Sequence, residues 1–270
     1  MVKENNQPSG TQLDTKQKQD VAVAQFEQFS GEGFSEVSTE DLAIPFLRIL
    51  AQLSPQCNKR DGAYVENAEA GHIYNTVQNE IYDGTQGISV VPCHYTRKFV
   101  EWTPREKGGG YIQSYSADDP IVGQATRNEA GQDTLPNGNL LTNTSHFFVL
   151  LLHKTIGPQR ALITMTSTQL KKGRKWLSQA QSLTAKGKNG LYTLPLMSQV
   201  YTLKTVQEQN DKGTWFGWDI SREKGLDLNN EDDKSIFHMG MEFAKSVKSG
   251  EVKIKTEEES TEQEKDETYM

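Results

Sequence analysis

The chain has 270 residues, of which 34% are hydrophobic, and a formal net charge of -7 at pH 7. Its longest apolar run, residues 147–152, is far shorter than the ~20 residues needed to cross a bilayer. The first residues lack an apolar signal region, so we expect a soluble, cytoplasmic protein. The mean hydropathy of -0.69 indicates that part of the chain is unfolded.

Along the chain, most segments with a regular pattern predict strands. Residues 1–20 are polar and predict a flexible leader. Apolar and β-branched runs predict strands over 44–50, 73–77 with 81–82, 88–102, 111–115, 147–154 with 160–165, and 197–206 with 214–220. Helical spacing is found from 170 to about 185 and over 232–248, whereas 117–144 reads as a loop. Within the long run 88–102, Pro92 predicts a bulge, a bend or an edge position.

This order predicts a mostly β protein of the α+β class. We expect an OB-like β-barrel with two packed helices and disordered termini. The predicted domains are a disordered leader over 1–20, a single nucleic-acid-binding domain over 21–255 and a disordered acidic tail over 256–270.

The acidic tail holds most of the net charge. Between Thr256 and Met270 seven acidic residues face one lysine, and Val, Ile, Leu and Phe are absent. Such a segment has nothing to bury and is expected to be disordered. Tethered near a cationic groove, it would compete with phosphates at high effective concentration; the alternative is a tail that only aids solubility. The tail residues predicted to act in this way or to bind a partner are Glu257, Glu258, Glu259, Glu262, Glu264, Asp266, Glu267 and Tyr269.

The middle of the chain has the opposite charge bias. Between Asp133 and Glu208 there are nine lysines and arginines and no acidic residue. A folded segment of this composition is expected to present a positive face, which fits nucleic acid; a solvated face or a site for another anion is the alternative.

Two stretches combine cations with aromatic rings, the residue types that bind phosphates and stack on bases in single strands. Along a strand over 95–102, Tyr95, Arg97 and Phe99 share one face, and Lys98 and Trp102 share the other. The second stretch is the basic segment from 171 to 188. The predicted nucleic-acid-binding residues are Tyr95, Arg97, Lys98, Phe99, Trp102, Arg105, Lys107, Tyr111, Lys171, Lys172, Arg174, Lys175, Trp176, Lys186 and Lys188.

No cofactor or metal site is predicted. Cys57 and Cys93 lack the short paired spacing of structural zinc sites and are expected to be reduced, mostly buried thiols, although Cys93 precedes His94. A metal-dependent nuclease could draw on four acids, Asp118, Asp119, Glu129 and Asp133. They lie in a Gly-, Asn- and Pro-rich segment, which favours turn residues over a rigid metal centre.

The sequence resembles the single-stranded DNA-binding proteins of tailed bacteriophages, including the T7-type protein. The resemblance is carried by 43–50, 54–56, 73–76, 99–102 and the three glycines 108–110, and spans roughly residues 35–255. It implies an oligonucleotide-binding barrel with an acidic tail, dimerisation, and a host-cytoplasmic protein that coats single strands during replication and recombination. It also implies contacts of the tail with a polymerase or helicase. The chain exceeds a minimal barrel in length, and it ends in Tyr269-Met270 rather than in Phe.

The sequence therefore predicts a non-catalytic protein that binds and protects single-stranded DNA. A virion or scaffolding protein remains the main alternative and a nuclease the lesser one. Strand annealing would use the same chemistry as coating.

Overall fold

The computed structural model describes residues 28–37, 41–211 and 213–252, and the chain divides into two units, residues 1–42 and 43–270. In the first unit the described residues form successive turns, with Glu32 N donating to Phe29 O at 3.1 Å. All described strands and helices lie in the second unit. The predicted leader over 1–20 and tail over 256–270 lie outside the described residues.

The second unit consists mainly of antiparallel strands. The strands are β1 Leu47–Ile49, β2 Ile73–Asn75, β3 Glu80–Tyr82, β4 Ile88–Trp102, β5 Tyr111–Ser116, β6 Thr126–Arg127, β7 Asp133–Thr134, β8 Leu140–His153, β9 Gly157–Thr166, β10 Thr184–Gly187, β11 Gly190–Thr193, β12 Gln199–Asn210 and β13 Gly213–Gly225. The α-helices are α2 Leu170–Gln181 and α3 Glu231–Ser249. Short 3-10 turns are η1 Pro55–Cys57, η2 Arg105–Lys107, η3 Val122–Gln124, η4 Ser167–Gln169 and η5 Leu196–Ser198.

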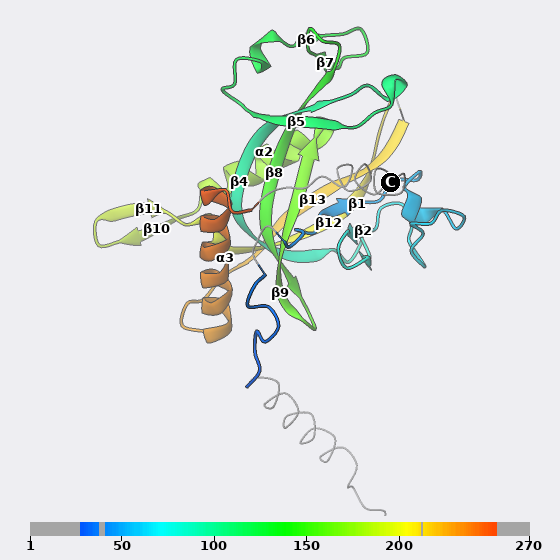
Figure 1. The fold of residues 1–270 in the computed structure, drawn as a ribbon. Helices are drawn as coiled ribbons and strands as arrows, with labels where there is room; N and C mark the ends of the chain where they lie inside the picture. Colours follow the sequence, from blue (N-terminus) through cyan, green and yellow to red (C-terminus); the bar gives the residue numbers. More distant parts are fainter. Residues whose placement is uncertain (1–27, 38–40, 212, 253–270) are drawn as a thin grey trace, which may run out of the picture. The chain divides into compact units, whose positions relative to one another are not determined.

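Two long strands, β4 and β8, form the centre of the main sheet. They pair from Val90 opposite Leu151 to Trp102 opposite Leu140. β12 pairs with the start of β4, β5 with its end, and β9 with β8. The sheet curls into an antiparallel half-barrel (Figure 1), which confirms the prediction of a mostly β fold. As expected, the ladder is irregular at Pro92, where the β4–β8 register shifts before His94.

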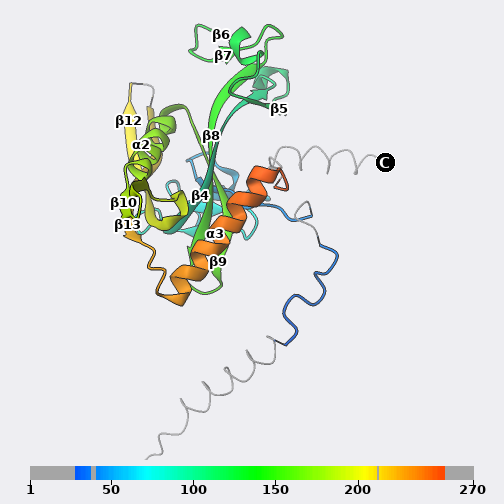
Figure 2. The same ribbon diagram turned by 90° about the vertical axis from the view of Figure 1, so that its left-hand side faces the viewer.

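The two helices cover opposite faces of β4 and β8 (Figure 2). Side chains alternate along a strand, so neighbouring phenylalanines of β8 point to different faces. Phe147 stacks on Trp176 of α2, with ring centroids 4.5 Å apart, whereas Phe148 meets Phe243 of α3 edge-on at 6.0 Å. Each aromatic contact lies in its own core cluster.

Local sequence explains the bounds of α3. Asn230 caps its N-terminus by accepting a hydrogen bond from Asp233 N at 3.0 Å, and three acids occupy the first turn. Gly250 ends the helix in the left-handed conformation, at φ 80°. The helix over 232–248 is therefore confirmed, and Phe243 of its apolar stripe is fully buried.

Two predicted segments need correction. The expected loop over 117–144 contains β6 and β7, and β8 begins at Leu140. The expected helix ends at Gln181, and β10 and β11 form a hairpin that projects from the rest of the second unit (Figure 1). Both misses involve strands of four or fewer residues, or a strand end rich in Thr and Asn, which give little hydrophobic signal.

Neither described helix has the length and hydropathy needed to cross a membrane. Both cysteines are free. Cys93 is buried, and this burial raises the pKa of its thiol to about 12. Over the described residues, no three or more His, Cys, Asp or Glu side chains come together as metal ligands could.

Candidate nucleic-acid interface

A cleft of about 390 Å³ opens on one face of the curled sheet. Its walls come from β1, β4, β5, β8 and β9, and Val252 closes one side. These strands are far apart in sequence and are brought together by the β4–β8 and β8–β9 pairings. The residues that line it are Phe46, Arg48, Lys98, Val100, Trp102, Tyr111, Ser114, Thr142, Thr144, His146, Thr164, Thr166 and Val252.

Strand alternation explains which part of β4 reaches the cleft. Lys98, Val100 and Trp102 occupy every second position and all line it. Lys98 lies opposite Thr144 of β8, which in turn lies opposite Thr166 of β9. The floor is thus a row of side chains from three adjacent strands, with threonines on two of them.

Two aromatic rings stand at one end of the cleft. Trp102 lies opposite Tyr111 in the β4–β5 ladder, and their rings meet edge-on with centroids 5.9 Å apart. Both side chains are half-buried, so part of each ring is available to a ligand. The Tyr111 and Ser114 hydroxyls lie 3.2 Å apart. Exposed aromatic rings beside cations can stack on bases.

The cleft is cationic at its rim and holds no carboxylate among its lining residues. Lys98 is half-buried, whereas Arg48 is exposed and places its guanidinium 5.9 Å from the centroid of the Tyr74 ring. Positive charge at the cleft favours an anionic ligand.

His146 forms part of the floor and is only 5% exposed. Its Nδ1 atom is buried and has no hydrogen-bond partner in the described part of the chain. Burial, aided by the charge of Lys98, lowers the pKa of His146 to about 4, so the imidazole is neutral near pH 7. The sequence prediction missed both His146 and Arg48. The alternation of polar side chains at 142, 144 and 146 was the available signal.

Glu101, also missed, holds the end of β4 against the loop before β8. Glu101 is 2% exposed, and its carboxylate accepts hydrogen bonds from Asn137 Nδ2 at 2.8 Å, from Asn139 Nδ2 at 2.6 Å and from the Tyr115 hydroxyl. Burial favours the neutral acid, but these hydrogen bonds outweigh it and hold the pKa of Glu101 below its usual value. The network fixes the strand end that carries Trp102.

The other half of the predicted β4 motif faces away from the cleft. The ring of Tyr95 packs on Phe147, with centroids 5.1 Å apart, on the face that α2 covers. The guanidinium of Arg97 lies 5.0 Å from the centroid of Phe99, and its Nε donates to Asn143 Oδ1 at 3.0 Å. Arg105 and Lys107 are exposed in η2, after the end of β4.

The cations of α2 point away from the sheet because Gly173, between them, and Trp176, directly after them, face the sheet. Gly173 is buried so closely that an added Cβ would lie 3.1 Å from the Phe147 ring. Trp176, three residues later on the same face, is 1% exposed. This burial corrects the expectation that Trp176 binds nucleic acid, because its ring belongs to the core.

The remaining predicted cations are split between α2 and the projecting hairpin. Lys171, Arg174 and Lys175 are exposed, but Lys172 Nζ pairs with Glu208 Oε1 at 2.7 Å. Lys186 and Lys188 are exposed on the β10–β11 hairpin. The predicted residues therefore do not form one groove: Lys98, Trp102 and Tyr111 line the cleft, and the others lie outside it.

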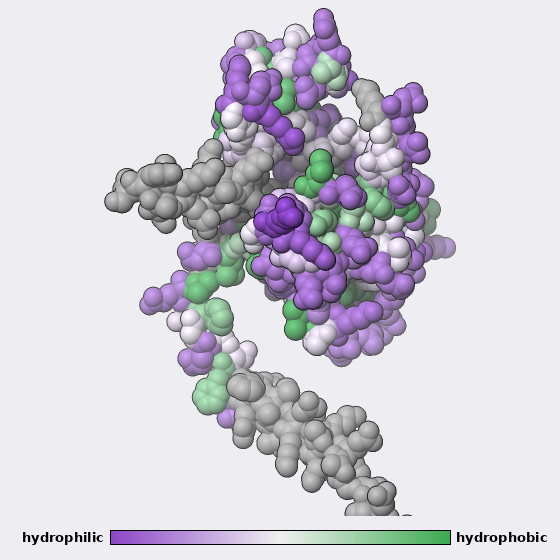
Figure 3. Space-filling model, turned by 90° about the vertical axis from the view of Figure 1, so that its right-hand side faces the viewer, coloured by the Kyte–Doolittle hydropathy of each residue, from purple (hydrophilic) through white to green (hydrophobic). Residues whose placement is uncertain are grey.

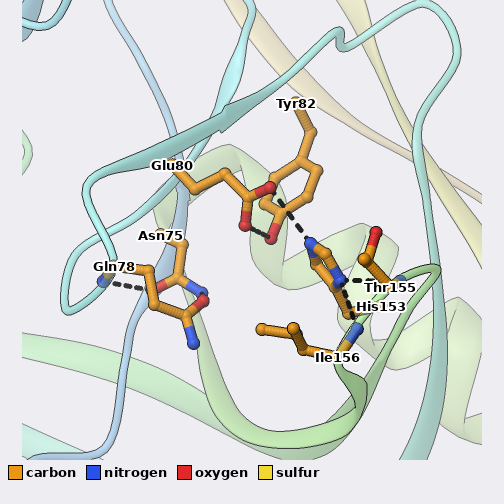
Figure 4. Close-up of polar contacts among 7 residues, drawn as sticks. All are labelled: Asn75, Gln78, Glu80, Tyr82, His153, Thr155 and Ile156. Atoms are coloured by element: carbon orange, nitrogen blue, oxygen red, sulfur yellow. Dashed lines mark hydrogen bonds and ion pairs between the residues drawn. The ribbon is translucent and has the colours of Figure 1, made fainter. Parts of the chain in front are cut away.

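A second polar cluster ties the β2–β3 hairpin to the β8–β9 hairpin (Figure 4). Glu80 Oε1 lies 3.0 Å from His153 Nε2, and the Tyr82 hydroxyl donates to Glu80 Oε2 at 2.6 Å. His153 Nδ1 accepts from the backbone N–H groups of Thr155 and Ile156. Because its members bond one another and the local backbone, we assign this cluster a structural role.

Three of the four acids of the nuclease alternative make local contacts. Asp119 Oδ1 accepts from Ile121 N at 3.0 Å, and Asp133 pairs with Arg127 at 3.0 Å. The pKa of Asp118 is lowered mainly by a hydrogen bond with Ser116, and Glu129 is exposed. These contacts account for Asp118, Asp119 and Asp133 without a shared site.

The acidic tail lies outside the described residues, which end at Val252. Val252, the last residue described, lines the cleft. The first tail acid, Glu257, follows five residues later in the sequence.

The fold and the cleft define a mostly β protein with a cationic, aromatic-lined cleft on a curled antiparallel sheet. The chain belongs to the Pam3 phage gp34-like protein family, whose model matches residues 14–253. No curated protein and no solved structure matches the chain. The resemblance to phage proteins is therefore confirmed at the level of a phage protein family.

Proposed function

We propose that this phage-family protein binds single-stranded DNA without catalysis and that the cleft is its contact site. The observation that carries the proposal is the combination of Lys98 and Arg48 with the partly exposed rings of Trp102 and Tyr111. Cations bind phosphates and rings stack on bases, and a lining without acids avoids repulsion of a polyanion.

A second set of cations lies away from the cleft, on α2. The face in Figure 3 is mostly hydrophilic, with smaller hydrophobic areas between. The cations of α2 lie on the face of β4 and β8 opposite to that of α3, and they supply a second, more exposed positive surface. We assign the α2 cations to weaker phosphate contacts that carry no base stacking.

The acidic tail is proposed to compete with the strand for the cleft. A chain spans at most about 3.3–3.6 Å per residue, so the acids 257–267 can fold back onto a cleft lined by Val252. Short flexible tethers give effective concentrations in the millimolar range. A long bound strand would displace the tail and free it for a polymerase or helicase. A homodimer that protects replication and recombination intermediates belongs to the same proposal.

The test is a titration of fluorescent single-stranded and duplex oligonucleotides with the full chain and with a truncation ending at Lys255, at two salt concentrations. We expect salt-sensitive, preferential binding of single strands, strengthened by removal of the tail. Lys98→Ala should weaken binding and reduce the magnitude of the salt slope by about 0.7. The matched control is Lys154→Ala, an exposed lysine at the far end of the β8–β9 hairpin. Failure of both chains to bind at low salt would contradict the proposal.

A further inference from the structure

The cleft has features that coating of a phosphate backbone does not need. Its volume of about 390 Å³ falls within the range of about 300–1,000 Å³ typical of small-molecule sites. Backbone contacts require only an exposed row of cations, as on α2. A cavity of this size instead fits a nucleotide that turns out of the bound strand and enters the cleft.

The polarity of the cleft is graded from floor to rim. The floor holds the neutral imidazole of His146 and hydroxyl groups of threonines, whereas the charges of Arg48 and Lys98 stand nearer the outside. A nucleotide has the same grading, with a neutral base that carries hydrogen-bonding edges and a charged phosphate at the other end.

His146 is the one buried nitrogen-bearing side chain among the residues that line the cleft. A buried polar group without a hydrogen bond costs about 1–3 kcal/mol, so such groups are normally paired. His146 is 5% exposed, lines the cleft and leaves Nδ1 without a partner among the described residues. By contrast, the hydroxyl of Thr144 on the same floor donates to Thr142 O at 3.2 Å.

We propose that the cleft captures one unstacked nucleotide of a bound strand, with the edge of its base on His146 and its phosphate at Lys98 and Arg48. This inference rests on the proposed function and deepens it. Trp102 and Tyr111 then hold the neighbouring base at the end of the cleft. Binding is expected to depend on base identity, because a base edge must match the donor and acceptor that the imidazole offers.

The first experiment uses the unmodified chain and needs no variant. A bound fluorescent strand is displaced with each of the four deoxynucleoside 5′-monophosphates and with deoxyribose 5-phosphate. At least one nucleotide should compete at a concentration tenfold or more below that of the sugar phosphate. Equal competition by all five compounds would overturn base capture and leave strand binding intact.

The second experiment measures the affinities of dT, dC and dA homopolymers of equal length for the unmodified chain and for His146→Leu. A specific base contact discriminates by about 1–3 kcal/mol, so the homopolymer affinities should differ by about 5- to 150-fold. In His146→Leu we expect this ratio to fall to near one, with the salt slope unchanged.

An unchanged ratio in a folded His146→Leu chain, or equal affinities in the unmodified chain, would contradict the inference. His146→Gln, which keeps a hydrogen-bonding group, covers the case in which the leucine variant does not fold, and it should retain a ratio above one. If the unmodified chain binds no strand at all, the proposed function itself fails, and this inference fails with it.

Discussion

Two regions of this molecule carry positive charge, and they differ in every other respect. The α2 helix and the β10–β11 hairpin hold more cations, but these are exposed and α2 keeps its one tryptophan in the core. The cleft at the end of β4 holds two cations, yet it combines them with partly exposed rings and a buried histidine whose Nδ1 has no hydrogen-bond partner among the described residues. We therefore propose the cleft, rather than the more highly charged α2 surface, as the binding site, because burial and strand facing bring rings and cations together there.

The largest expected effect is on stability, where Trp176→Ala and Trp102→Ala should differ clearly. Trp176→Ala removes a fully buried ring that stacks on Phe147 and should lower the free energy of unfolding by about 3–5 kcal/mol. Trp102→Ala removes a half-buried ring and should cost clearly less. Chemical denaturation of both variants measures the difference, and equal losses would break the comparison.

The stability of the protein should depend on pH through His146, on the floor of the cleft. The pKa of His146 falls from an ordinary value of about 6.5 to about 4 on folding, so the unfolded chain binds a proton more readily. Stability should therefore decrease as the pH falls from about 6.5 towards about 4, by on the order of 3 kcal/mol from this group.

Denaturation at several pH values checks this, with His146→Leu as the reference. The difference in unfolding free energy between the two chains should change across that window. A constant difference would show that His146 does not titrate as its burial implies.

The next largest difference between the cleft and α2 is expected in the affinity for single-stranded DNA. Trp102→Ala is expected to weaken binding of single strands by about 1–3 kcal/mol, or about 5- to 150-fold, because one stacking surface is lost. Phe99→Ala, on the opposite face of the same strand, is the matched control and should bind nearly as the parent does. Fluorescence anisotropy at fixed salt gives both values, and a larger loss for Phe99→Ala would move the site to the other face.

The smallest effect is expected at α2. Lys171→Ala combined with Lys175→Ala removes two exposed cations and should weaken single-strand and duplex binding alike, by a few-fold at low salt and less at high salt. The same titrations at two salt concentrations check this. A loss greater than that of Trp102→Ala would reverse the ranking of the two regions.

Much of the fold could be predicted from local sequence, because long strands carry strong periodic signals. β4, its irregularity at Pro92 and the shared face of Lys98 and Trp102 follow from residue type and alternation alone. The hairpin β10–β11 was missed although Asn189-Gly190 is a turn signal, because the helical pattern was extended too far.

The cleft itself could be predicted only in part. Which face of β4 would be open depends on where α2 and α3 pack, and that is a tertiary property. Arg48 and His146 join Lys98 through β1 and β8, and these non-local pairings cannot be derived from one sequence. The exposed basic run of α2 was the stronger sequence signal, and Gly173 and Trp176 within it were the residues that marked its buried face.

The central claim is tested most directly by crosslinking a photoreactive single strand to the full chain and mapping the attached peptides by mass spectrometry. The account predicts crosslinks at Trp102 and Tyr111, with few or none on α2 and the β10–β11 hairpin. Crosslinks confined to α2 or the hairpin would contradict the assignment of the cleft as the strand-binding site.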